Sequence, residues 1–160
     1  MTAIRQLYSF GQNIELLRHL NAQTIRFVLV GGLAVSFYCP KREAQDMDLV
    51  IDPDPVNAAK LDAILNSWGI PSAKMNRPGL QVVLKKIHNA DLLTPPLEWP
   101  IFAEISDHAL RCWVGGEIVP VASVLSLIRL KQIACTAQAD DAEKHLSDIA
   151  ALKGVLTASV

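Results

Sequence analysis

Two acidic residues separated by a single apolar residue, Asp46 and Asp48, are the part of the sequence best suited to chemistry. They begin a largely apolar run, Asp46 to Ile51, which predicts a buried β-strand. Because side chains alternate between the two faces of a strand, both carboxylates should project from the same face. Two like charges this close repel each other unless a cation lies between them, and hard oxygen ligands suit Mg²⁺. The pair therefore predicts a divalent metal site.

A pair of glycines, Gly31 and Gly32, comes shortly before the acidic pair. The apolar, β-branched run from Ile25 to Val30 predicts a buried strand that ends at these glycines, and Leu33 to Tyr38 predicts a short helix after them. Without a Cβ atom, the glycines let a ligand approach the backbone. The N–H groups that open the helix can then hold a phosphate.

Each of these signals also has a simpler explanation when it is taken alone. A glycine pair often marks only a turn, and an acidic pair is common at strand ends. The nearby Asp52-Pro53-Asp54 is better explained as a turn and helix cap. A calcium loop is disfavoured because Val50 and Ile51 stand where such a loop has further polar residues. The glycines and acids together, in this order and on these elements, favour a catalytic site.

The order of these motifs resembles that of the polymerase-β-type nucleotidyltransferases, in which a strand ending in Gly-Gly or Gly-Ser precedes an acid-apolar-acid strand. Here thirteen residues separate Gly32 from Asp46. Arg42, four residues before the acidic pair, resembles more narrowly the minimal bacterial nucleotidyltransferases that include AbiEii-type toxins and small antibiotic-modifying enzymes. The chain departs from many relatives at Gly32, where they have a serine whose hydroxyl contacts the triphosphate.

This resemblance implies roles for specific residues. Asp46 and Asp48 would hold Mg²⁺, with two ions expected, and Gly31, Gly32 and Arg42 would bind the NTP. Family members carry a third carboxylate on a later strand, and Asp91 in the predicted strand His88 to Leu93 matches it. It would bind a metal or accept the acceptor's proton. Alternatively, Asp91 lies at a turn or at an edge of the sheet.

The C-terminal part of the sequence resembles the tail of the toxin-type enzymes only in part. Lys131 and Asp148 match the family's lysine and final acid, which implies contact with the nucleotide. His145 stands where an acid is expected. The alternative is a surface pair between Lys144 and Asp148, one helical turn apart, with Lys131 extending its amine toward solvent.

Composition predicts one compact domain over residues 1–160, with 122–156 as a C-terminal pair of helices. The chain is 51% hydrophobic and carries a net charge of −1, which argues against broad electrostatic capture of nucleic acid. The three cysteines lack metal-type spacing and indicate buried or free thiols in a reducing compartment. Since no leader sequence and no run long enough to cross a membrane is evident, we expect a cytoplasmic protein.

The remaining elements follow from periodicity and turn residues. Helices are predicted over Ser9 to Leu20, Asp54 to Gly69, Ser123 to Thr136 and Asp140 to Lys153, the last capped by Gly154. Leu80 to Leu84 predicts a short strand, Pro95 to Asp107 a loop, and Arg111 to Val121 a hairpin turning at two glycines. Basic residues before Asp91 indicate a solvated edge or an acceptor-binding surface: Lys74, Arg77, Lys85, Lys86 and His88.

The predicted fold is therefore α/β, a small mixed β-sheet flanked by helices, with two C-terminal helices closing the site. The resemblance implies Mg-dependent transfer of a nucleoside monophosphate from an NTP, such as ATP, to an acceptor hydroxyl. A toxin-like enzyme would modify RNA or a protein and have an antitoxin partner, whereas a resistance enzyme would modify a small molecule. A catalytically silent nucleotide-binding module is the third possibility.

Overall fold

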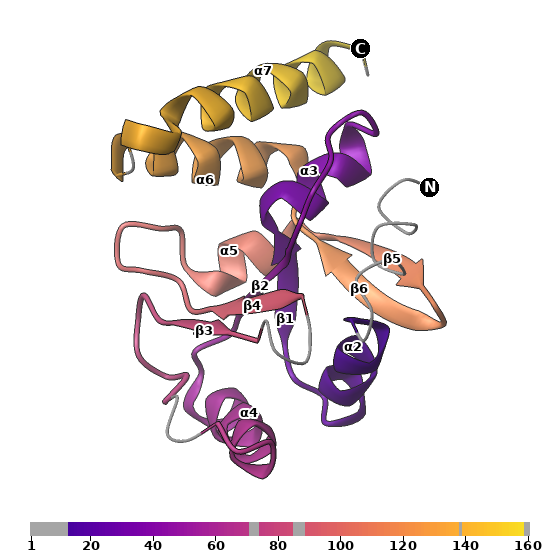
Figure 1. Ribbon diagram of the computed structural model, residues 1–160, viewed down its shortest axis with the longest axis vertical. Coiled ribbons are helices and arrows are strands. Elements are labelled where there is room, and N and C mark those ends of the chain that lie inside the picture. The colour runs from indigo at the N-terminus through magenta and orange to yellow at the C-terminus, as the bar shows by residue number, and fades with distance from the viewer. Residues whose placement is uncertain (1–12, 71–73, 85–88, 138, 159–160) are drawn as a thin grey trace.

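A six-stranded mixed β-sheet forms the centre of the protein (Figure 1). The computed structural model describes residues 13–70, 74–84, 89–137 and 139–158. The strands are β1 (Phe27–Val30), β2 (Met47–Ile51), β3 (Gln81–Val83), β4 (Ala90–Leu93), β5 (Leu110–Val114) and β6 (Glu117–Val121). Their order across the sheet is β3, β4, β2, β1, β6, β5. The predicted α/β fold with a small mixed sheet is thus confirmed.

The two central strands, β1 and β2, are antiparallel and almost entirely buried. Strand β2 is parallel to β4 on its other side, and β1 is parallel to β6. Their apolar side chains form the core together with helices from both ends of the chain. As the innermost strands, β1 and β2 hold the residues at their ends in fixed positions.

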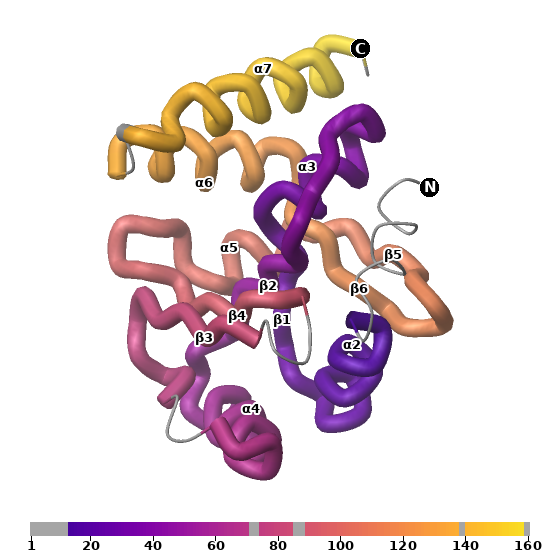
Figure 2. Tube along the Cα trace, in the orientation of Figure 1, coloured from indigo at the N-terminus to yellow at the C-terminus, as the bar shows by residue number. Residues whose placement is uncertain are grey.

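Six α-helices and one 3₁₀ turn surround the sheet in the part of the chain that the structure describes. They are α2 (Asn13–Ala22), α3 (Gly31–Tyr38), α4 (Pro55–Ser67), α5 (Phe102–Asp107), α6 (Val124–Ala137), the turn η1 (Ala139–Asp141) and α7 (Ala142–Ala158). Helices α6 and α7 lie side by side, and α3 lies between them and the central strands (Figures 1 and 2). The C-terminal helices therefore cover the end of the sheet where α3 begins.

Local sequence signals explain where helices α4 and α6 start. The Asp54 carboxylate accepts hydrogen bonds from the backbone N–H groups of Val56 and Asn57, at 3.1 and 3.2 Å, and Pro55 occupies the first turn of α4. Ser123 caps α6 by accepting a hydrogen bond from the N–H of Ser126 at 3.1 Å. These contacts confirm the cap at Asp54 and the predicted start of the penultimate helix.

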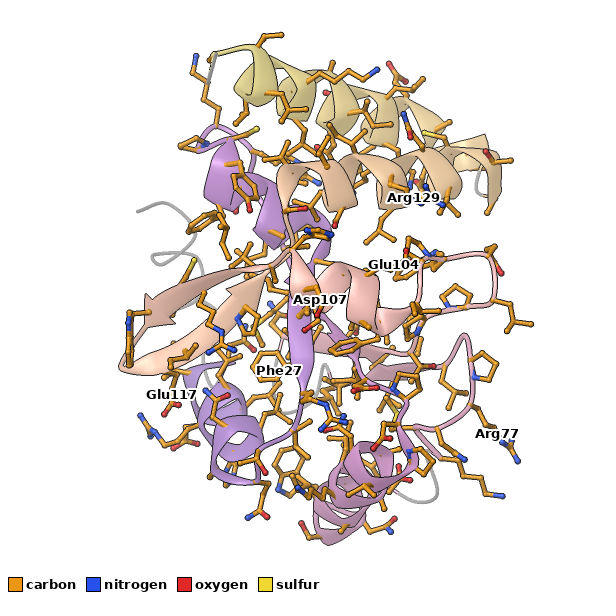
Figure 3. The ribbon with its side chains drawn as sticks, turned by 180° about the vertical axis from the view of Figure 1, so that it is seen from behind. Phe27, Arg77, Glu104, Asp107, Glu117 and Arg129 are labelled. Carbon is orange, nitrogen blue, oxygen red and sulfur yellow. The ribbon has the colours of Figure 1, made fainter. Side chains whose placement is uncertain are left out.

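The predicted hairpin is also present, with both turn glycines, Gly115 and Gly116, at positive φ. Viewed from behind, Figure 3 shows Glu117 of β6 beside α2. Its carboxylate accepts a hydrogen bond from Asn21 at 3.0 Å and lies 3.5 Å from the Arg18 guanidinium. These bonds tie the hairpin to α2.

Two predicted elements are wrong. The segment from Pro95 to Asp107 is not all loop, because it contains α5, whose Phe102 and Ile105 are buried one turn apart. Six residues are too few for a periodicity to stand out. The last helix does not end at Gly154 but continues to Ala158. Leu152, which is fully buried, precedes the glycine, and Leu156, which packs against the core, follows it; these contacts hold the helix on both sides of a residue that would otherwise favour its end.

Other boundaries differ by one or two residues or lie outside the described residues. The first described helix runs from Asn13 to Ala22, and the start of its predicted range is not described. The same holds for the residues numbered 85, 86 and 88, whose basic side chains were predicted at a sheet edge. The cysteines are free thiols, as predicted: Cys39, Cys112 and Cys135. No helix in the described ranges combines the length and apolar character needed to cross a membrane.

Candidate active site

Strand pairing places three predicted site residues at one end of the sheet. Val30, the last residue of β1, pairs with Asp48 of β2, and Asp48 in turn pairs with Asp91 of β4. Gly31 follows Val30 directly and opens α3. Because β4 lies between β2 and β3, the alternative that placed Asp91 at an edge of the sheet is wrong. The two carboxylates instead face each other across neighbouring parallel strands.

Gly31 is the residue on which this arrangement depends most closely. Its φ is +70°, a backbone conformation that residues with a side chain rarely adopt. A Cβ atom at this position would lie 2.2 Å from Oδ2 of Asp48. Only glycine therefore allows the chain to turn from β1 into α3 while the Asp48 carboxylate lies against its backbone.

The Asp48 carboxylate is held in a strongly unfavourable environment. Burial raises its pKa to about 6, and the negative charges of Asp91 and Asp46 raise it further, while Lys131 and Lys144 oppose the rise. A raised carboxylate pKa in a cavity is typical of functional sites. Negative charge thus accumulates here beyond what the nearby lysines neutralise.

Asp46 and Asp91 are the other two acids of the candidate site, and they differ in burial. Asp46 lies in the bend just before β2, one residue outside the strand predicted for it, and is half-buried. Asp91 is 7% exposed, and its Oδ2 accepts a hydrogen bond from Gln81 Nε2 at 3.2 Å. Within the described residues, no three acidic, histidine or cysteine side chains form a ready-made metal cluster. The chemistry of these carboxylates nevertheless fits a hard divalent cation.

Basic residues from distant parts of the chain meet at a buried acid, Asp148, which is 3% exposed. Its Oδ1 accepts a hydrogen bond from Arg42 Nε at 2.8 Å, and its Oδ2 lies 3.1 Å from Lys131 Nζ. The predicted alternative, a surface pair of Asp148 with Lys144 and a solvated Lys131, is therefore wrong. The structure brings Arg42, Lys131 and Asp148 together.

The charges around Asp148 are stabilised by these bonds. Burial by itself would raise the Asp148 pKa, but hydrogen bonds from Arg42 and Lys131 outweigh it and hold the pKa below its ordinary value. His145, whose Nδ1 lies 3.5 Å from Lys131 Nζ, has a lowered pKa because of burial and the Lys131 charge. Both effects favour the neutral form of the ring.

Two adjoining cavities open onto these groups. The smaller, of about 210 Å³, is lined by Gly31, Gly32, Arg42, Ala44, Gln45, Asp46, Asp48, Lys131, Asp141, Lys144 and His145. The larger, of about 530 Å³, includes the side chains of Gln81, Asp91, Glu98, Trp99, Leu127, Leu130 and Ile133. Gly31, Asp46, Asp48, Lys131 and His145 line both. Asp46, Asp48 and Lys131 thus lie where the two cavities meet, while Asp91 lines only the larger cavity and Arg42 only the smaller.

Sequence reasoning missed several residues that line this site. Gln81 gave no signal, because one polar residue in a three-residue strand is ordinary. Glu98 and Trp99 lie in a connection whose course depends on tertiary packing. His145 attracted notice only as a departure from an expected acid, although it lies at the junction of the cavities. Its position beside Lys131 follows only from the packing of α6 against α7.

No protein-family model matches the sequence, and neither does any curated protein at a significant level. Solved structures match the fold. An antigenic nucleotidyltransferase-like protein from Paracoccidioides brasiliensis has a TM-score of 0.55 at 21% identity, over 86% of this chain and 71% of that one. The region of similarity therefore includes most of the described residues.

Two structures of the antibiotic-resistance factor ANT(2")-Ia match as well. Its crystal structure in complex with adenylyl-2"-tobramycin has a TM-score of 0.55 at 18% identity, over 89% of this chain and 86% of that one. Its solution structure has a TM-score of 0.57 at 16% identity, over 98% and 85%. The chain therefore has the fold of nucleotidyltransferase-like proteins.

Proposed function

We propose that the protein transfers a nucleoside monophosphate from an NTP to an acceptor hydroxyl. The acceptor oxygen forms a bond to the α-phosphorus, the bond from that phosphorus to the bridging oxygen breaks, and pyrophosphate leaves. The observation that carries this proposal is the convergence of Asp46, Asp48 and Asp91 beside the glycine that opens α3, at the junction of two cavities. The nucleotidyltransferase-like fold supports it.

The smaller cavity is suited to the triphosphate. The first turn of α3 offers backbone N–H groups, and Val30 before it has an apolar side chain that cannot cap them. Gly31 and Gly32 line this cavity, and Lys131, which lines it too, would neutralise part of the phosphate charge. Phosphate binding at this end of α3 thus uses groups that the fold already presents.

The carboxylates suit a metal-bound triphosphate. Asp46, Asp48 and Asp91 would hold Mg²⁺, with two ions expected, and the metal would offset negative charge that develops on the phosphates. Mg²⁺ commonly uses one or two carboxylates together with phosphate oxygens, so a complete protein cage is not required. The raised pKa of Asp48 supports this assignment, because a cation would relieve the repulsion that causes it.

Asp91 has a second role in the proposed reaction. It is buried in the wall of the larger cavity, where an acceptor hydroxyl can reach it, and Gln81 orients its carboxylate. A carboxylate in this position can accept the proton that the attacking hydroxyl releases. Asp91 would therefore act on the acceptor in the larger cavity while the triphosphate lies in the smaller one.

A hydroxyl-bearing small molecule is the first candidate acceptor. The larger cavity, of about 530 Å³, has the size of small-molecule sites. Its wall combines acids, including Glu98, with Trp99 and the apolar face of α6. ANT(2")-Ia, which shares the fold, is described as an antibiotic-resistance factor.

A toxin-like activity on RNA or a protein is the second candidate, with an antitoxin as partner. It is favoured by the meeting of Arg42, Lys131 and Asp148, the residues on which the resemblance to AbiEii-type enzymes rests. Arg42 and Lys131 would face the NTP in either case. The acceptor alone distinguishes the two activities.

The test is a labelling experiment with α-labelled ATP, GTP, CTP and UTP in turn. Each is incubated with the protein, Mg²⁺ and either total RNA, lysate protein, or aminoglycoside and lincosamide drugs. Asp48→Asn serves as the inactive control. Label on a drug supports the first candidate, and label on RNA or protein supports the second. Tight NTP binding with no labelled acceptor would instead identify a silent nucleotide-binding module and refute the proposed transfer.

A further inference from the structure

The space beside Gly32 is occupied by the guanidinium group of Arg42. A Cβ atom on Gly32 would lie 3.0 Å from Arg42 Nη2 and 3.4 Å from its Cζ. These distances are shorter than most contacts that a Cβ makes, so the guanidinium would have to shift by a few tenths of an ångström to accept a side chain here. Glycine at this position thus lets Arg42 lie directly against the first turn of α3.

Arg42 is fixed there by its other contacts. Nε donates to Asp148 Oδ1 at 2.8 Å, Nη2 lies 3.5 Å from Asp148 Oδ2, and Nη1 donates to the backbone carbonyl of Glu43. The side chain is 22% exposed and lines the smaller cavity. A guanidinium held on several sides loses little conformational freedom when it binds an anion.

Asp148 is shared between two cations. Lys131 is 12% exposed, and its amine lies 3.1 Å from the carboxylate that Arg42 also contacts. One negative charge thus faces two positive charges, and both cations line the smaller cavity. The three side chains together carry a net charge of +1, in the wall of a cavity that Asp46 and Asp48 also line.

We propose that Gly32 makes room for Arg42 beside the expected phosphate site, and that Asp148 is a positioning residue that aims Arg42 and Lys131 at the phosphates. This inference rests on the proposed function, because it takes the smaller cavity as the triphosphate site. It assigns Asp148 no contact with the nucleotide. It also gives Gly32 a specific purpose, which is to make room for a cation.

A double-mutant cycle tests the first part, with inorganic tripolyphosphate and each NTP as probes in titration calorimetry. Gly32→Ala, which adds only the Cβ that would meet the guanidinium, should weaken tripolyphosphate binding by up to about ten-fold, the scale of losing one charge-assisted hydrogen bond. In the Arg42→Ala background, the same change should cost less than about two-fold, because the group that it displaces is already gone. Equal losses in both backgrounds would overturn the assignment of Arg42.

A second cycle tests the positioning role of Asp148. Arg42→Ala should cost about ten-fold or more in tripolyphosphate affinity in the wild type, but less than about two-fold in Asp148→Asn. A role in folding alone would leave the two costs equal, and that result would refute the positioning role. If Asp148→Asn fails to fold, as circular dichroism would show, the Gly32 cycle still decides the assignment of Arg42.

Arg26 provides the matched control. It forms a comparable ion pair with Asp52, at 2.7 Å, but lies before β1, at the end of the strand opposite to Gly31. Arg26→Ala should leave tripolyphosphate affinity unchanged. If the wild type binds neither tripolyphosphate nor any NTP, both the proposed function and this inference are overturned. If it binds NTP but shows no coupling of Arg42 to Gly32 or to Asp148, only this inference is overturned.

Discussion

Replacing Asp48 with asparagine should stabilise the protein at neutral pH, although the residue lies at the centre of the candidate site. Burial and the charges of Asp91 and Asp46 raise the Asp48 pKa from 3.8 to about 6. Each pKa unit corresponds to about 1.36 kcal/mol, so a rise of about two units destabilises the folded state by up to about 3 kcal/mol at pH 7. For a chain of this size, that is at most about 6 to 12 °C in melting temperature.

The sign of the effect follows from proton binding. Because the folded protein binds the Asp48 proton more tightly than the unfolded chain, the favourable contribution of protonation is fully present below pH 4 and is lost as pH rises through about 6. Asparagine does not titrate. The advantage of Asp48→Asn should therefore be small near pH 4, grow between pH 4 and 6, and remain constant above that.

The assay is thermal and urea unfolding of both proteins in EDTA between pH 4 and 8. Asp52→Asn, the same chemical change at the far end of β2, provides the control. It breaks a pair with an exposed arginine and should cost less than about 1 kcal/mol. If Asp48→Asn is less stable than the wild type at pH 7, or if its advantage does not change with pH, the electrostatic account of the site is wrong.

Four further results are expected. NTP binding should require Mg²⁺ or Mn²⁺, and the double variant Asp46→Asn, Asp48→Asn should lose that dependence. Calorimetry that gives the wild type the same NTP affinity with and without EDTA would contradict this expectation. Asp91→Asn should keep nearly normal NTP affinity but lose transfer on the order of 10²-fold or more, as measured with labelled NTP, and undiminished transfer would show that another group accepts the proton. Gly31→Ala should destabilise the fold by about 1–3 kcal/mol in urea unfolding, because residue 31 has a positive φ and the added Cβ would meet Asp48. As the control, Gly154→Ala in an open helical position should be neutral or stabilising. Asp148 has a lowered pKa, so its ion pairs stabilise the fold above about pH 4 and lose this effect as pH falls. Asp148→Asn should therefore cost about 3–5 kcal/mol of folding stability at pH 7 and less in acid. A cost in urea unfolding that does not change with pH would contradict the ion pairs.

The acidic half of the candidate site could be predicted because its signals are local. Gly31, Asp46 and Asp48 lie within eighteen residues of one another, on two strands whose hydrophobic runs are unambiguous. The spacing therefore indicated both the elements and the side chains that they present. Asp91 required the resemblance, since nothing in a single sequence shows that β4 pairs with β2 in register.

The basic half depends on contacts that the sequence does not reveal. Arg42 and Asp148 are 106 positions apart, and their ion pair forms only because α7 packs against α6 and α3. Helical spacing instead suggested a pair between Asp148 and Lys144, which the structure excludes by burying Asp148. Likewise, α5 is too short for its buried residues to show a period. Tertiary packing decided each of these cases.

The separation of these two halves along the chain has a consequence for synthesis. A ribosome makes the acidic residues first, and Asp148, which holds the two cations, about 57 residues after Asp91. At roughly 5–20 residues per second, that interval lasts roughly 3–11 s. During translation, the nascent chain therefore carries Arg42 and the three carboxylates before it has the acid that holds Arg42 and Lys131 in place. The candidate site can be complete only after α7 has been made and has packed against α6.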